Sequence, residues 1–497
     1  MQAEIRWPVI CFHLLSIPLK NRYFKKLFVM DVIPGGIMNK RMGFWCLMVW
    51  TVVAVVPCFA LYNRQGIPDS SEIRQKLVES WFTAPVEAVR EKVPELHRNN
   101  VGTVFQVRSE ENGSQLMIVV APRQKIAVDM YSGGQVSAST VDVYPATASG
   151  SWVLYRDIKS GTPLFIRYYF ASEPEVYMQM NFSNHKVLAD FVVFDGYAAR
   201  GVPVGMPFQR LYKASFLEVF DLTESTLPWN YINIMPALYH PILQMIAVVR
   251  ENLDRITPLE DAAYNEDGNA VYISTGKQRI ESLEMREQQG LALSSAGFIK
   301  WIVDGLVIPV GGSYTRLEPL MVPTVQFRQG SFAESVGEEF AVSFSLDWTR
   351  NLAAAVLSTY SGRNFYYNTS GCDVLIEPFA AEIDEFGKLS NSLGYLKDTG
   401  YRINTIKGLL YVLAVTEPGK LYLGAVRQSH RPSVDSPEVQ FFTESVAIFP
   451  YFDTYGRFQV VIFENGKELS LETFMDRYKD SYVHLVRINA SERFFPQ

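Results

Sequence analysis

The chain has 497 residues and a formal net charge of −6, and hydrophobic residues make up 48% of it. This length predicts two or three domains with substantial cores, and the composition is ordinary for a folded protein. The negative charge, without a basic stripe or a basic tail, argues against nucleic acid as a partner.

The most biased segment lies near the N-terminus. Met38-Asn-Lys-Arg-Met precedes an apolar run over residues 43–56, and a small residue, Ala60, follows it. A charged start, an apolar centre and a cleavage point after a small residue are typical of a secretory signal peptide. Met38 is then the expected start of the protein, and residues 1–37 are an upstream extension.

Residues 38–62 also fit an uncleaved signal-anchor helix, because residues 43–62 are just long enough to span a bilayer. Basic residues before this run would hold its start in the cytoplasm. A third interpretation is lipid attachment at Cys58, although Pro57 directly precedes that cysteine. All three interpretations export the rest of the chain, which would be periplasmic or anchored to the inner membrane by its N-terminal segment.

The cysteines agree with export. Cys11, Cys46 and Cys58 lie at or before this segment, so Cys372 alone remains in the exported part. No disulfide within that part and no cysteine-based metal site are expected. The histidines do not have zinc-binding spacing either, so we predict neither a metal nor a cofactor.

Residues 63–200 are predicted to combine a helical start with a β-rich stretch. Apolar spacing indicates one or two helices over residues 70–93. Short runs rich in Val, Ile, Phe and Tyr follow, separated by turn residues: 101–108, 115–120, 125–130, 152–156, 164–170, 176–182 and 187–194. Strands of this length and spacing predict an antiparallel sandwich or a small barrel.

The remainder is predicted to be a second domain over residues 208–497, after a Gly- and Pro-rich linker at residues 201–207. Helices are expected over residues 208–220, 242–253, 279–289, 290–306 and 348–360. Strands are expected over residues 408–416, 420–427, 444–449, 457–464 and 482–488. The predicted fold class is therefore α+β, with a sandwich-like N-terminal domain and a second α+β domain that contains an antiparallel sheet.

The central helix, from Gly290 to Leu306, begins at a run of small residues. Ser294 or Ser295 can accept a hydrogen bond from the free N–H groups of the first turn. Gly305 is where such a helix is expected to end. A side chain at this helix start lies in the positive end of the helix dipole, which activates a cysteine nucleophile.

The run S-S-A-G-F-I-K-W, which begins at Ser294, resembles the D-C-S-G-F-V-K-Y nucleophile motif of the NlpC/P60 family, papain-like cell-wall peptidases. Ser294 stands at the Asp and Ser295 at the catalytic Cys, and Gly297 stands at the Gly of the motif. Glu417-Pro-Gly-Lys-Leu-Tyr-Leu is similar to that family's P-G-D-L-V-Y strand entry. The resemblance implies a papain-like fold for residues 208–497.

The same resemblance places the other catalytic positions. The histidine position falls on Ser445, or on Glu444 with a shift of one residue, and the orienting group falls near Glu464. A serine without a base beside it is a weak nucleophile at neutral pH. His430 is the alternative base for Ser295. These departures from the pattern favour a protein that does not cleave its ligand.

Three functions follow from the sequence. The first is a non-catalytic NlpC/P60-like domain of an exported cell-envelope protein, which binds peptidoglycan peptide or a protein partner. Aromatic side chains are the candidate binding residues for this function: Trp301, Tyr451, Phe452 and Tyr455. The second is an active cell-wall hydrolase that uses Ser295. The third is a membrane-anchored structural or assembly component of the envelope.

Overall fold

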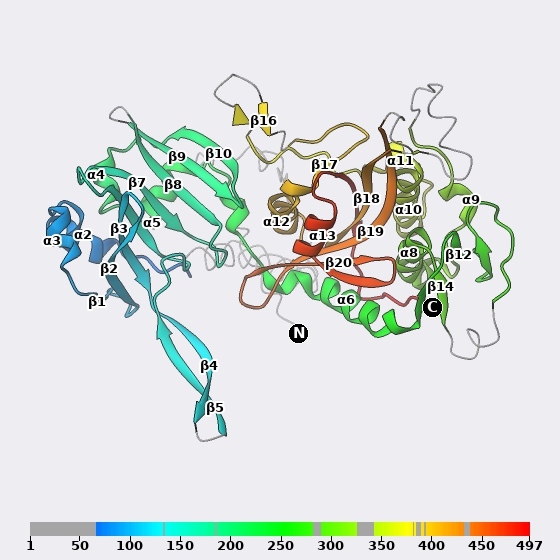
Figure 1. Ribbon diagram of the computed structural model, residues 1–497, viewed down its shortest axis with the longest axis horizontal. Coiled ribbons are helices and arrows are strands. Elements are labelled where there is room, and N and C mark those ends of the chain that lie inside the picture. Colours follow the sequence, from blue (N-terminus) through cyan, green and yellow to red (C-terminus); the bar gives the residue numbers. More distant parts are fainter. Residues whose placement is uncertain are drawn as a thin grey trace, which may run out of the picture. The chain divides into compact units, whose positions relative to one another are not determined.

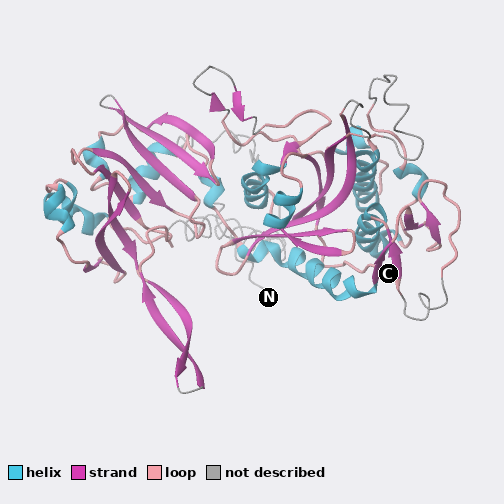
Figure 2. Ribbon diagram, in the orientation of Figure 1, coloured by secondary structure: helices cyan, strands magenta, loops and turns pink. Residues whose placement is uncertain are grey.

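The computed structural model describes residues 66–132, 135–183, 186–281, 290–325, 342–380, 382–383, 389–391, 394–431 and 438–497. A β-rich part, from residue 95 to residue 203, precedes a part in which helices pack on a second sheet (Figures 1 and 2). The predicted α+β class is confirmed. The predicted extension at residues 1–37 and the segment at residues 38–62 lie outside the described residues. Among the helices that are described, none has the length and apolar character needed to cross a membrane.

An eight-stranded antiparallel sheet forms the β-rich part. Its strands follow one another in chain order: β1 (Glu95–Arg98), β2 (Val104–Asn112), β3 (Gln115–Pro122), β6 (Trp152–Asp157), β7 (Pro163–Tyr169), β8 (Val176–Ser183), β9 (Lys186–Val193) and β10 (Gly196–Pro203). The hairpin of β4 (Gln124–Ser132) and β5 (Gln135–Val143) projects from this sheet (Figure 1). We expected a sandwich-like pair of sheets, whereas the described strands form one sheet with helices packed on it.

The helices that pack on this sheet come from the chain segments before and after it in the sequence. They are α2 (Ser71–Leu77), a π-helical turn η1 (Val78–Phe82), α3 (Val86–Arg90), α4 (Phe208–Leu211) and α5 (Phe216–Thr223). The Phe82 ring packs against Trp152, and the Phe170 ring packs against Phe216. The segment predicted as a linker is part of this unit, because residues 201–203 end β10 and Met206 is buried.

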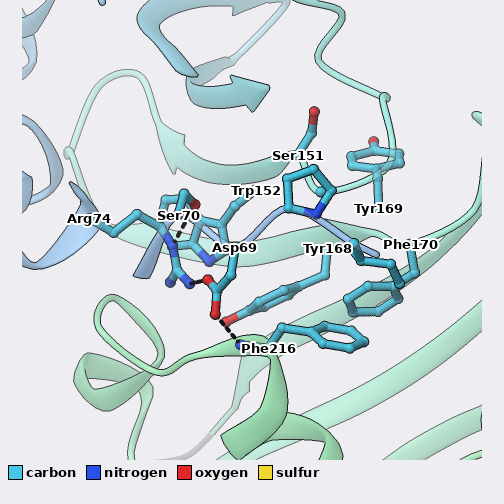
Figure 3. Close-up of a pocket in the computed structure, with 12 residues that line it drawn as sticks. Asp69, Ser70, Arg74, Ser151, Trp152, Tyr168, Tyr169, Phe170 and Phe216 are labelled. Carbon is cyan, nitrogen blue, oxygen red and sulfur yellow. Dashed lines mark hydrogen bonds and ion pairs between the residues drawn. The ribbon is translucent and has the colours of Figure 1, made fainter. Parts of the chain in front are cut away.

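Arg74 connects the helices before the sheet to those after it. Its side chain is 2% exposed. The guanidinium donates to three backbone carbonyl oxygens near α4: Leu211 (3.0 Å), Tyr212 (3.2 Å) and Ala214 (2.7 Å). Asp69 accepts a further bond from Arg74 and another from the backbone N–H of Phe216 (Figure 3). The cavity beside this cluster is about 20 Å³, room for about one water, so Arg74 serves as a structural clamp.

A six-stranded antiparallel sheet is the centre of the second part. Its order is β17 (Tyr401–Arg402), β22 (Tyr482–Asn489), β18 (Lys420–His430), β19 (Val439–Phe452), β20 (Phe458–Glu464) and β21 (Lys467–Ser470). In Figure 1 this sheet lies between α12 (Ile406–Thr416) on one side and α8 (Ser295–Gly311) with α10 (Phe344–Ser361) on the other. The other elements are α6 (His240–Asn252), β11 (Ile256–Pro258), β12 (Ala262–Tyr264), β13 (Ala270–Tyr272), β14 (Leu291–Leu293), α9 (Leu317–Leu320), α11 (Tyr367–Ser370), β15 (Glu382–Ile383), β16 (Leu389–Asn391) and α13 (Leu471–Arg477).

Two sequence predictions about helices are wrong. Residues 408–416 were predicted as a strand but belong to α12. A short run of apolar residues that is buried on all sides has no periodicity, so its sequence does not distinguish a helix from a strand. The central helix continues beyond Gly305 to Gly311, and Gly312 caps it with a φ of 75°. Gly305 instead makes room for the C-terminal segment, since a Cβ atom there would lie 2.6 Å from the Phe494 ring. Most of the predicted helix over residues 279–289 lies outside the described residues.

Replacing Arg74 by Met is expected to lower the free energy of unfolding by about 3 kcal/mol, because three buried carbonyl groups lose a charged donor. Chemical denaturation followed by circular dichroism measures this change. Arg90 is the control, since it pairs with Glu87 and Glu111 at the surface, and Arg90→Met should leave the midpoint almost unchanged. Equal losses in the two variants would show that Arg74 is not a clamp.

Candidate functional site

The first turn of α8 is fixed by the backbone of β12. Ser294 is the N-cap, and its Oγ accepts a hydrogen bond from the N–H of Gly297 at 3.1 Å. The same hydroxyl donates to the carbonyl oxygen of Ala262 at 3.1 Å, and the Ser294 N–H donates to that oxygen at 2.9 Å. Of the two serines that could cap the helix, Ser294 does so, which leaves the side chain of Ser295 available for other partners.

Gly297 permits this close approach between α8 and β12. A Cβ atom on Gly297 would lie 2.0 Å from the carbonyl oxygen of Ala262, a distance at which no side chain fits. The glycine of the motif therefore has a steric role here, independent of any chemistry at Ser295.

Ser295 is the first residue of α8 and is half-buried. Its hydroxyl acts on the carboxyl group of Glu444, which lies on β19, and lowers the pKa of that group. Burial raises the pKa of Glu444, and the nearby Glu464 carboxylate raises it further. The Ser295 hydroxyl and the charge of Arg477 lower this pKa instead. The group beside Ser295 is thus a carboxyl that burial biases toward its protonated form.

Glu464, on β20, lies directly opposite Val446 of β19 in the sheet register. Its two carboxylate oxygens accept hydrogen bonds from the hydroxyl of Tyr478 and the guanidinium of Arg477. The pKa of Tyr478 is raised, chiefly by burial and by this bond to Glu464. Glu464 is therefore held by α13 and the residue that follows it, and it is not free to orient a catalytic base.

Ser445 is fully buried, and its Oγ has no hydrogen-bond partner among the described residues. It pairs with Ala425 of β18, which pairs in turn with His484 of β22, so these residues share one face of the sheet. Consecutive strand residues point to opposite faces, so Glu444 leaves the sheet on the other side. Of the two predicted positions, Glu444 is the one whose pKa Ser295 affects.

His430, the alternative base, is the last residue of β18 rather than part of a loop. Its backbone pairs with Val439, and residues 439 to 444 span about 16 Å along β19, so His430 lies far from Glu444. Three other described histidines have partners elsewhere: His97 contacts Glu95, His240 contacts Glu492, and His484 contacts Asp373. The structure places none of these four beside Ser295.

The predicted aromatic binding residues occupy different environments. Phe452 is buried in the core, where its ring packs against Tyr411 of α12. Tyr455 is 74% exposed in the turn between β19 and β20, and Tyr451 is half-buried on β19. Trp301 is 3% exposed and lines a cavity beside α8. The set therefore does not form one continuous surface, and Phe452 is a core residue.

The sequence did not reveal the partners of Glu464, because Arg477 and Tyr478 lie outside the motif. It also missed Lys300 and Asp304, two charged residues four positions apart in the apolar run of α8. Their spacing was the available signal, since such pairs face the same side of a helix. The described residues contain no cluster of three His, Cys, Asp or Glu side chains suited to a metal ion.

Comparison with known proteins covers the first part of the chain. Residues 63–231 match the model of a family described as Domain of unknown function (DUF8515). The matched segment contains the Arg74 clamp, the eight-stranded sheet and the helices α4 and α5 that pack on it. No curated protein and no solved structure matches the chain.

Replacing Gly297 by Ala is expected to lower the free energy of unfolding by about 2 kcal/mol, because the new methyl group overlaps the carbonyl of Ala262. Thermal and denaturant unfolding measure the change. Gly311→Ala is the matched control at the end of the same helix, where the nearest atom is a movable methyl of Thr359 at 3.1 Å. A Gly297→Ala protein as stable as the control would mean that α8 does not dock on β12 this closely.

Proposed function

We propose that this chain is an exported cell-envelope protein whose residues 208–497 form an NlpC/P60-like domain that binds a peptide without cleaving it. The peptide is that of peptidoglycan or a segment of a protein partner. One observation carries the proposal: at the nucleophile position a serine acts on a partly buried carboxyl and lowers its pKa, where the peptidase pattern has a cysteine and an imidazole.

The chemistry at this site supports binding over cleavage. A thiol peptidase needs a thiolate, an imidazole that pairs with it and a group that orients the imidazole. Ser295 has a hydroxyl that stays protonated at neutral pH, and Glu464 is already engaged by Tyr478 and Arg477. Hydroxyl and carboxyl groups at a half-buried helix start are still well suited to hydrogen-bond the amides of a bound peptide.

Export is supported by the sequence alone. Residues 38–62 have the pattern of a signal peptide or signal anchor, and the match to the family of unknown function begins at residue 63, directly after that segment. The acidic net charge fits a peptide or protein partner rather than nucleic acid.

We predict that the full-length protein binds muropeptides in isothermal titration calorimetry and leaves them intact in a digestion assay followed by mass spectrometry. Ser295→Ala should not change the digestion result, because there is no activity to lose. Cleavage by the wild type that disappears in Ser295→Ala would refute the non-catalytic proposal.

A thiol variant extends this test. Ser295→Cys places a stronger nucleophile at the helix start, and Ser137→Cys, on the exposed strand β5, controls for any unspecific reaction of a thiol. Without an imidazole, Ser295→Cys should release less than about one hundredth of the product expected for an acid–base-assisted enzyme. Efficient cleavage by this variant alone would show that a base remains beside residue 295.

A second function, hydrolysis by Ser295, is favoured by the same interaction between Ser295 and Glu444. A Glu444 carboxylate could take the proton of the Ser295 hydroxyl as that oxygen attacks an acyl carbon, and the positive end of α8 would stabilise the charge that develops. The base must be ionised, so this activity would be low below the pKa of Glu444 and would rise as the pH passes it. Because burial raises that pKa, the rise would come at a higher pH than for an ordinary glutamate.

A fluorophosphonate probe separates the two functions. The non-catalytic proposal predicts no labelling of Ser295 between pH 4 and pH 8, as judged by peptide mass spectrometry. Labelling that rises with pH and falls at least about 100-fold in Glu444→Gln would establish the hydrolase instead. Asp453→Asn is a suitable control, because Asp453 bonds only to its own turn among the described hydrogen-bond partners.

A further inference from the structure

A cavity of about 90 Å³ lies beside α8. Residues of β12, β14 and α8 line it, together with Tyr314 and Gln497. Lys300 and Asp304 line it from α8 and are 1% and 2% exposed. A water molecule occupies about 30 Å³ in the liquid, so the cavity has room for about three waters or for a chemical group of four heavy atoms.

The two charged residues differ in how completely they are satisfied. The Asp304 carboxylate accepts bonds from Lys300 at 2.7 Å and from the N–H and hydroxyl of Thr315 at 2.8 and 2.6 Å. Among the described residues, the Lys300 ammonium has one hydrogen-bond partner, Asp304. An ammonium carries three donors, so Lys300 has donors to spare in a cavity that it lines.

The charges around Lys300 determine which kind of ligand group can accept a hydrogen bond from its ammonium. Asp304 and Glu266 both act on this lysine as negative charges, and both oppose the effect of burial, which lowers its pKa. With Asp304 bonded to it and the charge of Glu266 also acting on it, the ammonium leaves no excess of positive charge for an anion. A neutral acceptor such as an amide carbonyl can take the spare donors without this repulsion.

Aromatic side chains complete the wall. Trp301, Tyr264 and Tyr314 line the cavity, and the Trp301 indole N–H is already bonded to the backbone oxygen of Gln497 at 2.8 Å. The hydroxyls of Tyr264 and Tyr314 are likewise bonded, to Glu281 and Gln497, so these aromatic side chains offer apolar contact rather than further donors. Such a wall suits a methyl group and the flat face of an amide.

We propose that this cavity binds the acetamide-like group of an N-acylated ligand, with Lys300 donating to the carbonyl oxygen and the aromatic rings packing against the methyl group. The group has four heavy atoms, which matches the volume, and the rest of the ligand remains outside. This site does not include Ser295 or Glu444, so its test is independent of the proposed peptide binding.

The test uses full-length protein labelled with 5-fluorotryptophan. The ¹⁹F resonance of Trp301 is assigned by its absence in Trp301→Phe and is followed while N-acetylglucosamine, N-acetylalanine amide or glucose is added. We expect a saturable shift with at least one acetylated probe and none with glucose. A shift with the sugar alone, the peptide alone or both identifies the source of the amide. No shift with either acetylated probe, or an equal shift with glucose, would overturn the proposal.

A paired variant tests the role of Lys300. Lys300→Met with Asp304→Leu removes both charges together, which avoids leaving one buried charge unpaired. It should weaken the binding of the acetylated probe at least about tenfold, whereas Lys277→Met, at an exposed lysine, should not change it. Unchanged affinity in a folded paired variant would exclude Lys300 as the donor. The comparison with glucose needs no variant and remains decisive if this one does not fold.

Discussion

The contact between the first turn of α8 and the carbonyl oxygen of Ala262 determines the geometry of both sites beside this helix. Two hydrogen bonds from Ser294 hold the turn on that oxygen, and the missing side chain of Gly297 allows the approach. With the helix start fixed in this way, Ser295 reaches Glu444 on β19. Lys300, one turn further along α8, then lines the cavity on the side of β12. A single packing constraint thus positions two sets of polar groups.

Four carboxyl groups of the second part, all at least partly buried, have unlike partners. Glu464 is bonded to a guanidinium and a phenol, Asp304 to an ammonium, and Asp373 to the guanidinium of Arg350. Glu444 is only partly buried, and its pKa reflects opposing effects: burial and Glu464 raise it, whereas the neutral hydroxyl of Ser295 and the charge of Arg477 lower it. A carboxyl in this state, at a half-buried helix start, is a feature more typical of a functional site than of a structural ion pair.

The sequence allowed the α+β class, the helix start and most strands of the second sheet to be predicted, because these rest on local periodicity and on cap residues. It could not decide between Ser445 and Glu444, since spacing along one strand does not show which of two neighbouring residues acts on a distant side chain. It mistook α12 for a strand, because an apolar run carries no period when every side is buried. Gly305 was assigned to a helix end although its role is to contact Phe494, a long-range contact that no local pattern reveals.

The pKa of Glu444, measured by ¹³C NMR of glutamate-labelled protein, tests the central claim most directly. We expect a pKa above that of an ordinary glutamate, about 4.3, because the carboxyl is partly buried. Ser295→Ala should raise it further, because the hydroxyl that stabilises the charged form is lost. An ordinary pKa that does not respond to Ser295→Ala would show that the Glu444 carboxyl is neither shielded from water nor influenced by the start of α8.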